Sequence, residues 1–168
     1  DFEELKWLQP GLSWSPDSKK IVFAAKAGKG DVLHVVEVET GKGEKYELDI
    51  EGVFSASWSP LGNQIAYVGQ SGNSSDIYIF DLNSQISKKI TNDIFSDSYP
   101  TWSGDGKNIA FVSDRDNEIS GAYDGFMYEH DYSQTDIYSV NVETKKIDRV
   151  TNTCLLYTSD AADDGYRG

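Results

Sequence analysis

The residues best suited to chemistry lie in one polar segment, residues 114–132. Its first five positions carry carboxylate and amide side chains at Asp114, Asp116, Asn117 and Glu118. Oxygen ligands of this kind suit Ca²⁺. Their spacing matches only the beginning of an EF-hand-type calcium loop. We therefore expect no cofactor, and the alternative is calcium held by Asp114, Asp116 and Glu118.

The second half of the same segment is rich in aromatic side chains. It contains Tyr123, Phe126, Met127 and Tyr128, followed by His130. Loops on a rigid scaffold are where binding residues concentrate, and Tyr, Phe and Met are favoured at the centres of interfaces. We expect these five residues to contact a protein or peptide partner. The alternative is a solvated loop without a binding role.

The other parts of the sequence lack the residue patterns that catalysis commonly uses. His34 and His130 are the only histidines, and neither lies in a His-Glu-x-x-His zinc motif. The sequence has no Gly-x-Ser-x-Gly nucleophile elbow, no phosphate-binding glycine loop and no Cys-x-x-Cys pair. His34 falls within an apolar run, so we expect a packed or half-exposed strand residue. The sequence predicts a chain that is not an enzyme.

The elements that must position the polar segment are visible in a repeat. Trp14, Trp58 and Trp102 follow one another at intervals of 44 residues, and the text after each is similar. A turn with Pro or Gly comes first, because Pro presets φ and Gly supplies a positive φ. An apolar run then follows, and the three runs are Ile21–Ala24, Ile65–Val68 and Ile109–Val112.

Two further strands complete each copy. The third strand begins at an aspartate, at Asp31, Asp76 and Asp136, and a polar turn leads to a fourth. Four short strands in a period of this length are typical of one blade of a β-propeller. The predicted fold class is all-β, a partial β-propeller of three consecutive four-stranded antiparallel blades. The blades fall at about 8–50, 51–94 and 95–153, within a domain of residues 1–153.

The third copy is longer than the second by 16 residues. The extra residues lie between Phe111 and Asp136, because the strands before and after that interval keep their spacing. We expect them to project from the blade between its second and third strands. The tryptophans are expected to pack in the core or between blades, and the three aspartates to accept turn hydrogen bonds. The apolar second strands should be buried on both faces.

The repeat resembles that of a known family. The text Trp-Ser-Pro-Asp followed by Ile-Ala-Phe and Asp-Ile-Tyr is similar to the propeller repeat of TolB and its relatives, and covers Leu12 to Asn152. A related repeat occurs in tricorn-type and prolyl-oligopeptidase-type peptidases. Copy one departs from the pattern with Ser18 in place of the turn glycine, and copy three with Gly104 in place of proline.

This resemblance implies a non-catalytic protein-interaction scaffold, periplasmic or otherwise extracytoplasmic. The alternative is the propeller of a multidomain peptidase, which gates or feeds a catalytic domain elsewhere in the parent chain. A carbohydrate-handling propeller is a third option that no residue pattern selects. A peptidase domain in the complete gene would identify the second role, and a short N-terminal domain with a signal peptide the first.

The net charge and the length of the apolar runs exclude some classes of partner. The 168 residues carry a net charge of −13 and a pI near 4.4, which argues against nucleic acid and anionic membranes. No apolar run is long enough to insert in a membrane. Propellers close with about four to eight blades. We therefore expect three blades to be part of a longer protein, to meet its remaining blades, and to be marginally stable or aggregation-prone alone.

The C-terminal residues 154–168 break the repeat where another copy should begin. Cys154 to Asp163 resembles a translated adapter from a sequencing library, so we expect this tail to be foreign to the natural protein. Cys154 is the only cysteine, which excludes a disulfide within the chain. Placed in a foreign tail, it is not a candidate nucleophile.

Overall fold

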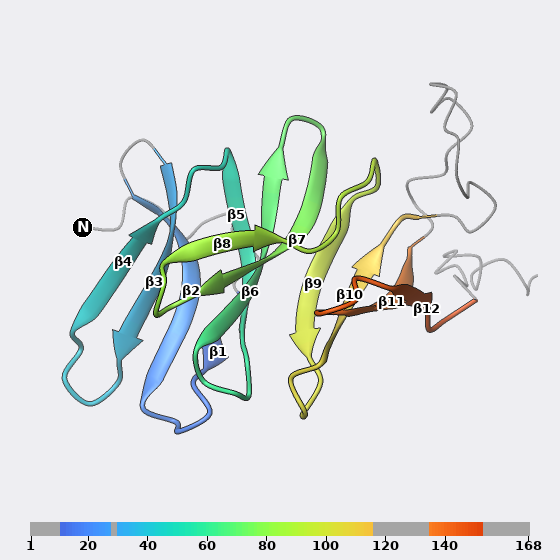
Figure 1. The fold of residues 1–168 in the computed structure, drawn as a ribbon. Helices are drawn as coiled ribbons and strands as arrows, with labels where there is room; N and C mark the ends of the chain where they lie inside the picture. Colours follow the sequence, from blue (N-terminus) through green and yellow to red (C-terminus); the bar gives the residue numbers. More distant parts are fainter. Residues whose placement is uncertain (1–10, 28–29, 116–134, 153–168) are drawn as a thin grey trace, which may run out of the picture.

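The computed structural model describes residues 11–27, 30–115 and 135–152, and these form three antiparallel sheets of four strands each (Figure 1). Strands that are neighbours in a sheet are also neighbours in the sequence. None of the described residues lies in a helix, so this part of the chain holds no helix that could span a membrane. The predicted all-β fold with three four-stranded blades is confirmed.

The three blades lie side by side in chain order (Figure 1). Blade 1 consists of β1 (Ser13–Trp14), β2 (Lys20–Ala27), β3 (Gly30–Glu37) and β4 (Gly43–Glu47). Blade 2 consists of β5 (Gly52–Trp58), β6 (Gln64–Ser71), β7 (Ser74–Asp81) and β8 (Ile86–Lys89). Blade 3 consists of β9 (Asp97–Trp102), β10 (Asn108–Ser113), β11 (Asp136–Asn141) and β12 (Ile147–Arg149).

The turn after each tryptophan is closed by local hydrogen bonds. In blade 1, the Ser15 hydroxyl donates to Asp17 Oδ1 (2.6 Å) and accepts from the N–H of Lys20 (2.8 Å). Ser103 makes the equivalent two bonds in blade 3. These bonds satisfy polar groups that the tight turn leaves without sheet partners. The repeated serine is therefore a turn residue.

One residue of each turn has a positive φ angle. It is Ser18 in blade 1 (φ 58°), Gly62 in blade 2 (φ 94°) and Gly106 in blade 3 (φ 69°). Glycine adopts this region without a steric penalty, whereas serine carries a Cβ atom into it. Copy one thus departs from the repeat in the residue at this position and not in the backbone conformation.

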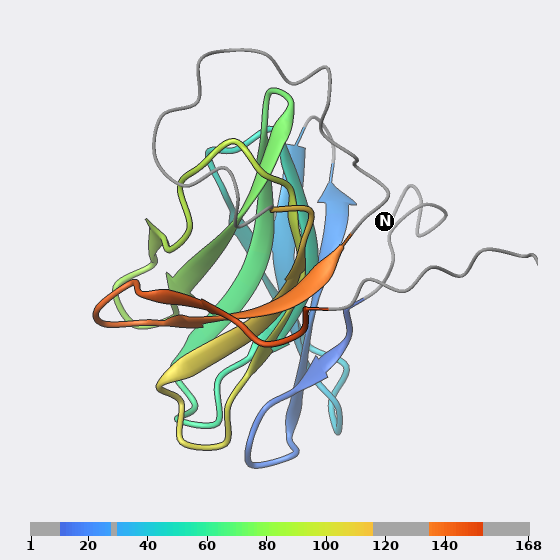
Figure 2. The same cartoon turned by 90° about the vertical axis from the view of Figure 1, so that its right-hand side faces the viewer.

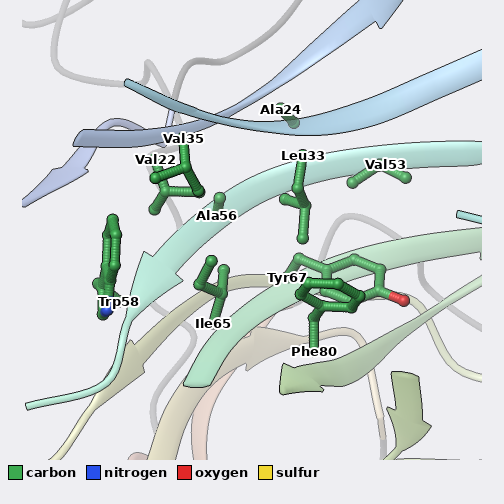
Figure 3. Packing of buried hydrophobic residues seen from close by; sticks show 10 residues of the cluster. All are labelled: Val22, Ala24, Leu33, Val35, Val53, Ala56, Trp58, Ile65, Tyr67 and Phe80. Atoms are coloured by element: carbon green, nitrogen blue, oxygen red, sulfur yellow. The ribbon is translucent and has the colours of Figure 1, made fainter. Parts of the chain in front are cut away.

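Two apolar cores join the blades. The first lies between blades 1 and 2 and is drawn in Figure 3: Val22, Ala24, Leu33, Val35, Val53, Ala56, Trp58, Ile65, Tyr67 and Phe80. The second lies between blades 2 and 3: Ala66, Val68, Ile77, Ile79, Ile90, Trp102, Ile109, Phe111, Tyr138 and Val140. Each blade is therefore held mainly by the apolar face that it buries against a neighbour.

Strand β6 of blade 2 contributes to both cores. Ile65 and Tyr67 belong to the core shared with blade 1, and Ala66 and Val68 to the core shared with blade 3. Alternate residues of a strand point to opposite faces, so a strand covered on both faces can be apolar throughout. The prediction of burial on both faces is confirmed for this strand.

The same prediction is wrong for the second strands of the outer blades. In β2, Ile21 and Phe23 are partly exposed, and in β10 the partly exposed residues are Ala110 and Val112. Each outer blade has a neighbouring blade on one side only among the described residues. Their apolar runs therefore bury one face and leave the other incompletely covered.

The burial of each repeated tryptophan also depends on whether a described blade covers it. Trp58 and Trp102 are 7% and 9% exposed and pack between blades, as expected. The Trp102 indole N–H also donates to the Ser57 carbonyl of blade 2 (3.1 Å). Trp14, in contrast, is 55% exposed. Its position in the repeat is a packing position, but no described blade precedes it.

The strand registers correct the predicted alignment of the aspartates. Leu33 occupies in the β2–β3 hairpin the place that Ile77 occupies in β6–β7. The residue before it, Val32, is therefore the equivalent of Asp76. Asp31 lies one position earlier, so copy one lacks this aspartate. The alignment from the sequence matched Asp31 to Asp76 because both are aspartates near the start of the third strand. The register is set instead by the hydrogen-bonded pairing of the strands.

We expected these aspartates to accept hydrogen bonds within turns, and the partners that the structure shows are different. Asp76 forms an ion pair with Lys89 (2.7 Å), and Asp136 accepts from the Thr151 hydroxyl (2.6 Å). Both carboxylates thus tie the start of the third strand to the end of the fourth. The carboxylate of Asp31 instead accepts a backbone N–H from β5 of the next blade.

Candidate functional site

The insertion leaves blade 3 between β10 and β11, as the sequence predicts. Of the predicted site residues, Asp114 is described. The candidate calcium ligands Asp116 and Glu118 lie outside the described residues. So do the predicted partner contacts Tyr123, Phe126, Met127, Tyr128 and His130. What the structure describes is the root of the insertion.

Asp114 fastens this root to the segment before β9. Its side chain is buried, and Oδ1 accepts a hydrogen bond from the backbone N–H of Ser96 (2.7 Å). A carboxylate held in this way has less capacity left for a cation. Among the described residues, no group of three or more His, Cys, Asp or Glu side chains could hold a metal ion. The calcium hypothesis stays a prediction about the remaining candidates.

Arg115 makes the second attachment of the root. Its Nη2 atom lies 2.8 Å from Asp97 Oδ1 and 3.2 Å from Asp93 Oδ2, and its Nε donates to the Ser113 hydroxyl (3.0 Å). The side chain is 9% exposed. Charge-assisted hydrogen bonds at low exposure are stronger than those at the surface. We refer to Asp93, Asp97, Ser113 and Arg115 as the root clamp.

Aromatic rings enclose the root clamp. The guanidinium carbon of Arg115 lies 5.0 Å from the Phe111 ring centroid and 5.2 Å from that of Tyr138. The Tyr138 hydroxyl donates to the Arg115 carbonyl (2.6 Å). Cations over aromatic faces gain electrostatic attraction, which adds to the ion pairs. Side chain and backbone of Arg115 are both held, so the insertion starts from a fixed point.

Asp97 has a raised pKa. It is fully buried, and this burial raises the pKa of its carboxyl group to about 6. The positive charge of Arg115 and the hydroxyls of Thr91 and Ser113 act in the opposite direction without cancelling the effect of burial. A pKa near 6 suits proton transfer, but this carboxylate is buried and engaged by Arg115. Its described contacts hold the Arg115 side chain in place.

Sequence reasoning missed the root clamp, although the repeat contains the signal. Asp97 occupies the position of Val53, 44 residues earlier, and Arg115 occupies that of Ser71. An acid in place of a buried apolar residue requires a partner, because burial of an unpaired charge is costly. A comparison of the copies position by position would have shown that Asp97 and Arg115 both depart from the repeat in blade 3, and would have predicted that they form a pair.

A groove runs across the inner strands of the three blades. It encloses about 480 Å³ and is lined by Gly11–Ser13, Ser55–Ser57 and Tyr99–Thr101, which are the same positions of the three copies. Leu12 and Tyr99 are exposed there. The close approach of the blades at Gly11 requires glycine, since a Cβ atom would lie 2.7 Å from the Ser55 Cα.

Backbone irregularities shape this groove. The β5–β6 pairing shifts register between Phe54 and Ser57, and the pairing of β10 with β9 shifts at the equivalent place. Ser55 (φ 49°) and Tyr99 (φ 53°) lie in these bulges with positive φ angles. A β-bulge leaves one residue outside the ladder and turns its side chain. The bulges thus place Ser55 and Tyr99, which are 44 residues apart, in the wall of the groove.

A second cavity has Ser55 and Tyr99 in common with the groove, and Asp97 in common with the root clamp. It encloses about 340 Å³ between blades 2 and 3, and Phe54 and Val68 line it beside several serines. Ser96 and Asp97 line it as well. These two residues also hold the insertion. The root of the insertion and the cavity therefore share one wall.

His34 lies away from this region, within β3 of blade 1. It is buried, and its ring meets the ring of Phe23 edge to face, with centroids 5.1 Å apart. Burial lowers the pKa of its imidazole. His34 is thus a strand residue, as predicted, and of the two predicted environments it has the packed one. The other histidine lies outside the described residues.

Comparisons with solved structures give the fold. TolB from Acinetobacter baumannii is 22% identical, with a TM-score of 0.67 over 90% of this chain and 34% of that one. A protein of Agrobacterium tumefaciens assigned as TolB is 16% identical, with a TM-score of 0.66 over 86% and 50%. The tricorn protease is 19% identical, with a TM-score of 0.55 over 83% and 14%. The chain thus spans about a third to a half of the TolB structures.

Comparison of the sequence with curated proteins gave no match. A family model described as the TolB beta propeller domain matches residues 7–160, which include all three blades. The match extends over most of the chain and agrees with the three described sheets. The chain belongs to the TolB beta propeller domain family.

Proposed function

We propose that this chain is part of a protein-interaction scaffold that acts outside the cytoplasm and binds a protein or peptide partner. The observation that carries the proposal is that Ser96 and Asp97 both line the cavity between blades 2 and 3 and hold the root of the insertion. A blade needs only a short connection there, as between β6 and β7 of blade 2. The extra residues and their clamp are thus not required for strand pairing.

The partner would meet the insertion and the adjoining cavity together. The predicted contacts in the insertion are Tyr123, Phe126, Met127, Tyr128 and His130. Tyr99 would add an exposed aromatic ring at the cavity. Aromatic residues near polar groups are typical of interface centres. TolB-like neighbours support the extracytoplasmic location as an expectation.

The test compares the chain with a variant whose insertion is cut to the length of the blade 2 connection. Peptides selected from a displayed library on the full chain are titrated against both by calorimetry. Binding should disappear in the short variant while its β-type circular dichroism spectrum stays the same. Ile86→Ala, an exposed position on β8 away from the cavity, serves as the control. Unchanged binding would contradict the proposal, and collapse of the fold would make the insertion structural.

The calcium alternative has its own measurement. Thermal unfolding of the full chain is followed with and without Ca²⁺, beside an Asp116→Ala, Glu118→Ala double variant. A ligand that binds the folded state raises the unfolding temperature. If Ca²⁺ shifts the full chain and not the variant, the insertion holds the ion. If neither shifts, the calcium alternative is removed.

A second candidate role is that of a propeller domain in a multidomain peptidase. The resemblance in fold to the tricorn protease favours it, although that TM-score is below those of the TolB structures. The two roles separate at the level of the complete gene. A peptidase domain on the same polypeptide would replace the scaffold proposal, whereas a short N-terminal domain with a signal peptide would support it.

A further inference from the structure

A further cavity lies between the connection from blade 1 to blade 2 and the strands of blade 2. It encloses about 720 Å³, and acidic, tyrosine and serine side chains line it beside Leu48 and Ile50. The acids are Asp49 and Glu51, and both are exposed. No Lys or Arg is present among the described residues of its lining. We refer to this cavity as the acidic cavity.

The equivalent positions of the next copy surround the side chain of an arginine. Four lining residues have these equivalents 44 positions later: Asp49 (Asp93), Glu51 (Phe95), Tyr67 (Phe111) and Ser71 (Arg115). The hairpin registers make Tyr78 the equivalent of Tyr138. Figure 2 views the arc from the side of blade 3, with β11 and β12 nearest the viewer and the other blades behind them. The two contacts between blades thus follow one another along the line of sight.

The guanidinium group of Arg115 shows what these positions can hold. Its Nη2 atom lies 3.2 Å from Asp93 Oδ2. Its central carbon lies 5.0 Å from the ring centroid of Phe111 and 5.2 Å from that of Tyr138. In the copy that forms the acidic cavity, Ser71 takes the place of the arginine. This copy therefore keeps one acid and two aromatic rings of the arrangement, but its own side chain is too short to reach them.

The second acid of the arrangement is present at a different position. Asp97, which pairs with Arg115, corresponds to Val53, and Val53 belongs to the apolar core. Glu51 takes the place of Phe95. Its Oε2 atom accepts the N–H of Gly72 (2.8 Å), which holds the carboxylate at the cavity. A carboxylate has about four acceptor sites, so Glu51 can also receive a cation.

Lys89 is a cation near the acidic cavity, and it is already paired. Its Nζ atom lies 2.7 Å from Asp76 Oδ2 and 5.8 Å from the ring centroid of Tyr78. Arg149 pairs with Asp136 in the same register of blade 3, where the guanidinium of the root clamp is accommodated as well. Lys89 therefore does not take the place of that guanidinium.

We propose that the acidic cavity binds an arginine side chain of a protein or peptide partner, between the carboxylates of Asp49 and Glu51 and beside the ring of Tyr78. A guanidinium group matches carboxylates with its planar fork and stacks on aromatic rings, which an ammonium group does not do equally well. The net charge of −13 attracts a cationic partner. The described lining contains no residue of blade 3, so the inference does not rest on the partner proposed for the insertion.

The first experiment compares three blocked peptides of five residues that differ only in the central one, which is arginine, lysine or citrulline. Each is titrated into the full chain in about 0.15 M salt, and the amide signals of Gly72 and Tyr78 are followed by NMR. Citrulline has the shape of arginine without its charge, so its peptide should bind more weakly by about tenfold or more. The lysine peptide should also bind more weakly than the arginine peptide. Equal binding of the arginine and citrulline peptides would overturn the proposal.

Ser71→Arg tests the equivalence of the two places directly. It supplies the arginine that Arg115 supplies in blade 3, so the variant should lose the arginine peptide and melt at a higher temperature. Val38→Arg adds the same charge at a position that is 48% exposed and outside the lining, and should bind the peptide as the unmodified chain does. If Ser71→Arg still binds the peptide with unchanged affinity, the acidic cavity is not the site.

A second pair of variants answers the question even if Ser71→Arg does not fold. The double variant Asp49→Asn, Glu51→Gln removes two charges from the cavity and should weaken the arginine peptide by about tenfold or more. Glu39→Gln, Glu47→Gln removes two charges from exposed positions outside the lining, and should leave the affinity nearly unchanged. An equal loss in both double variants would mean that the peptide follows the net charge alone, and the proposal would fail.

Discussion

At the residue scale, the blades differ most where a repeated position has changed its chemistry. Ser18 replaces a turn glycine and keeps its positive φ angle. Asp97 replaces a buried apolar residue and is held by Arg115. Both deviations are visible in the printed sequence, but only the second has a compensating partner among the described residues. The first therefore costs free energy, and the second alters how the stability depends on pH.

Ser18→Gly should stabilise the chain. Serine in the left-handed region carries a steric cost that glycine avoids, although glycine gains entropy in the unfolded chain. We expect a net increase of roughly 0.5–1 kcal/mol in the free energy of unfolding. Urea denaturation measures it. Gly62→Ser, at the equivalent turn of blade 2, is the reciprocal change and should destabilise, because an added Cβ atom there meets no atom closer than 3.7 Å and only the positive φ angle is unfavourable. A loss of stability in Ser18→Gly would contradict the steric argument.

Asp97 should make the folded chain less stable as the pH rises from 4 to 7. Its pKa is raised from 3.8 to about 6, so the folded state keeps a proton that the unfolded state has lost in this range. The stabilisation from the protonated form is fully present below pH 3.8 and is lost as the pH rises through about 6. The shift corresponds to about 3 kcal/mol at most.

The measurement is the free energy of unfolding against pH, compared with Asp97→Asn at one protein concentration. Between pH 4 and pH 7, the free energy of unfolding of the unmodified chain should fall relative to that of Asp97→Asn. His34 acts in the opposite direction, because burial lowers its pKa, but its contribution is common to both and cancels. Arg115→Met should extend the fall in stability to higher pH, since Arg115 lowers the pKa of Asp97. The same pH dependence in all three proteins would refute the raised pKa of Asp97.

At the scale of the elements, the sequence predicts strands well and their partners less well. The period of 44 residues and the turn residues locate all twelve strands of the described part, because strand and turn chemistry is local. The position of the insertion follows from the same spacing. The aspartate alignment failed, because one residue of register depends on pairing between strands and not on the letters. The root clamp was missed because its members are separated in sequence and meet only in the folded blade.

The link between the third and fourth strands should depend on a buried threonine in blade 2. The Thr91 hydroxyl accepts the N–H of Ile77 (2.8 Å) and is buried beside Asp76. Thr91→Val removes this acceptor and leaves a buried donor without a partner, at a cost of about 1–3 kcal/mol. Chemical denaturation measures the loss.

Thr151→Val provides the matched comparison in blade 3. Thr151 accepts the N–H of Ile137 in the same way but is only partly buried. Water can replace a partner that is lost near the surface, so the cost there should be smaller. An equal or larger loss for Thr151→Val would show that burial does not decide the strength of this link.

At the scale of the whole molecule, stability is set by how many neighbours each blade has. Blade 2 is packed on both faces, whereas blades 1 and 3 each have one described neighbour. In arrays of this kind the stability is approximately a sum over units and over contacts between neighbours. The sequence contains the repeat that makes the contacts, but it does not show which faces are covered in the folded chain.

The middle blade should therefore open least often, and amide hydrogen exchange can show this. Backbone amides of β6 and β7 should exchange slowest, since opening them breaks contacts with two blades. Amides of β2 and β10 pair in ladders of the same type but bury one face, so they should exchange faster. Uniform exchange over the three blades would show that the arc opens as one unit and not blade by blade.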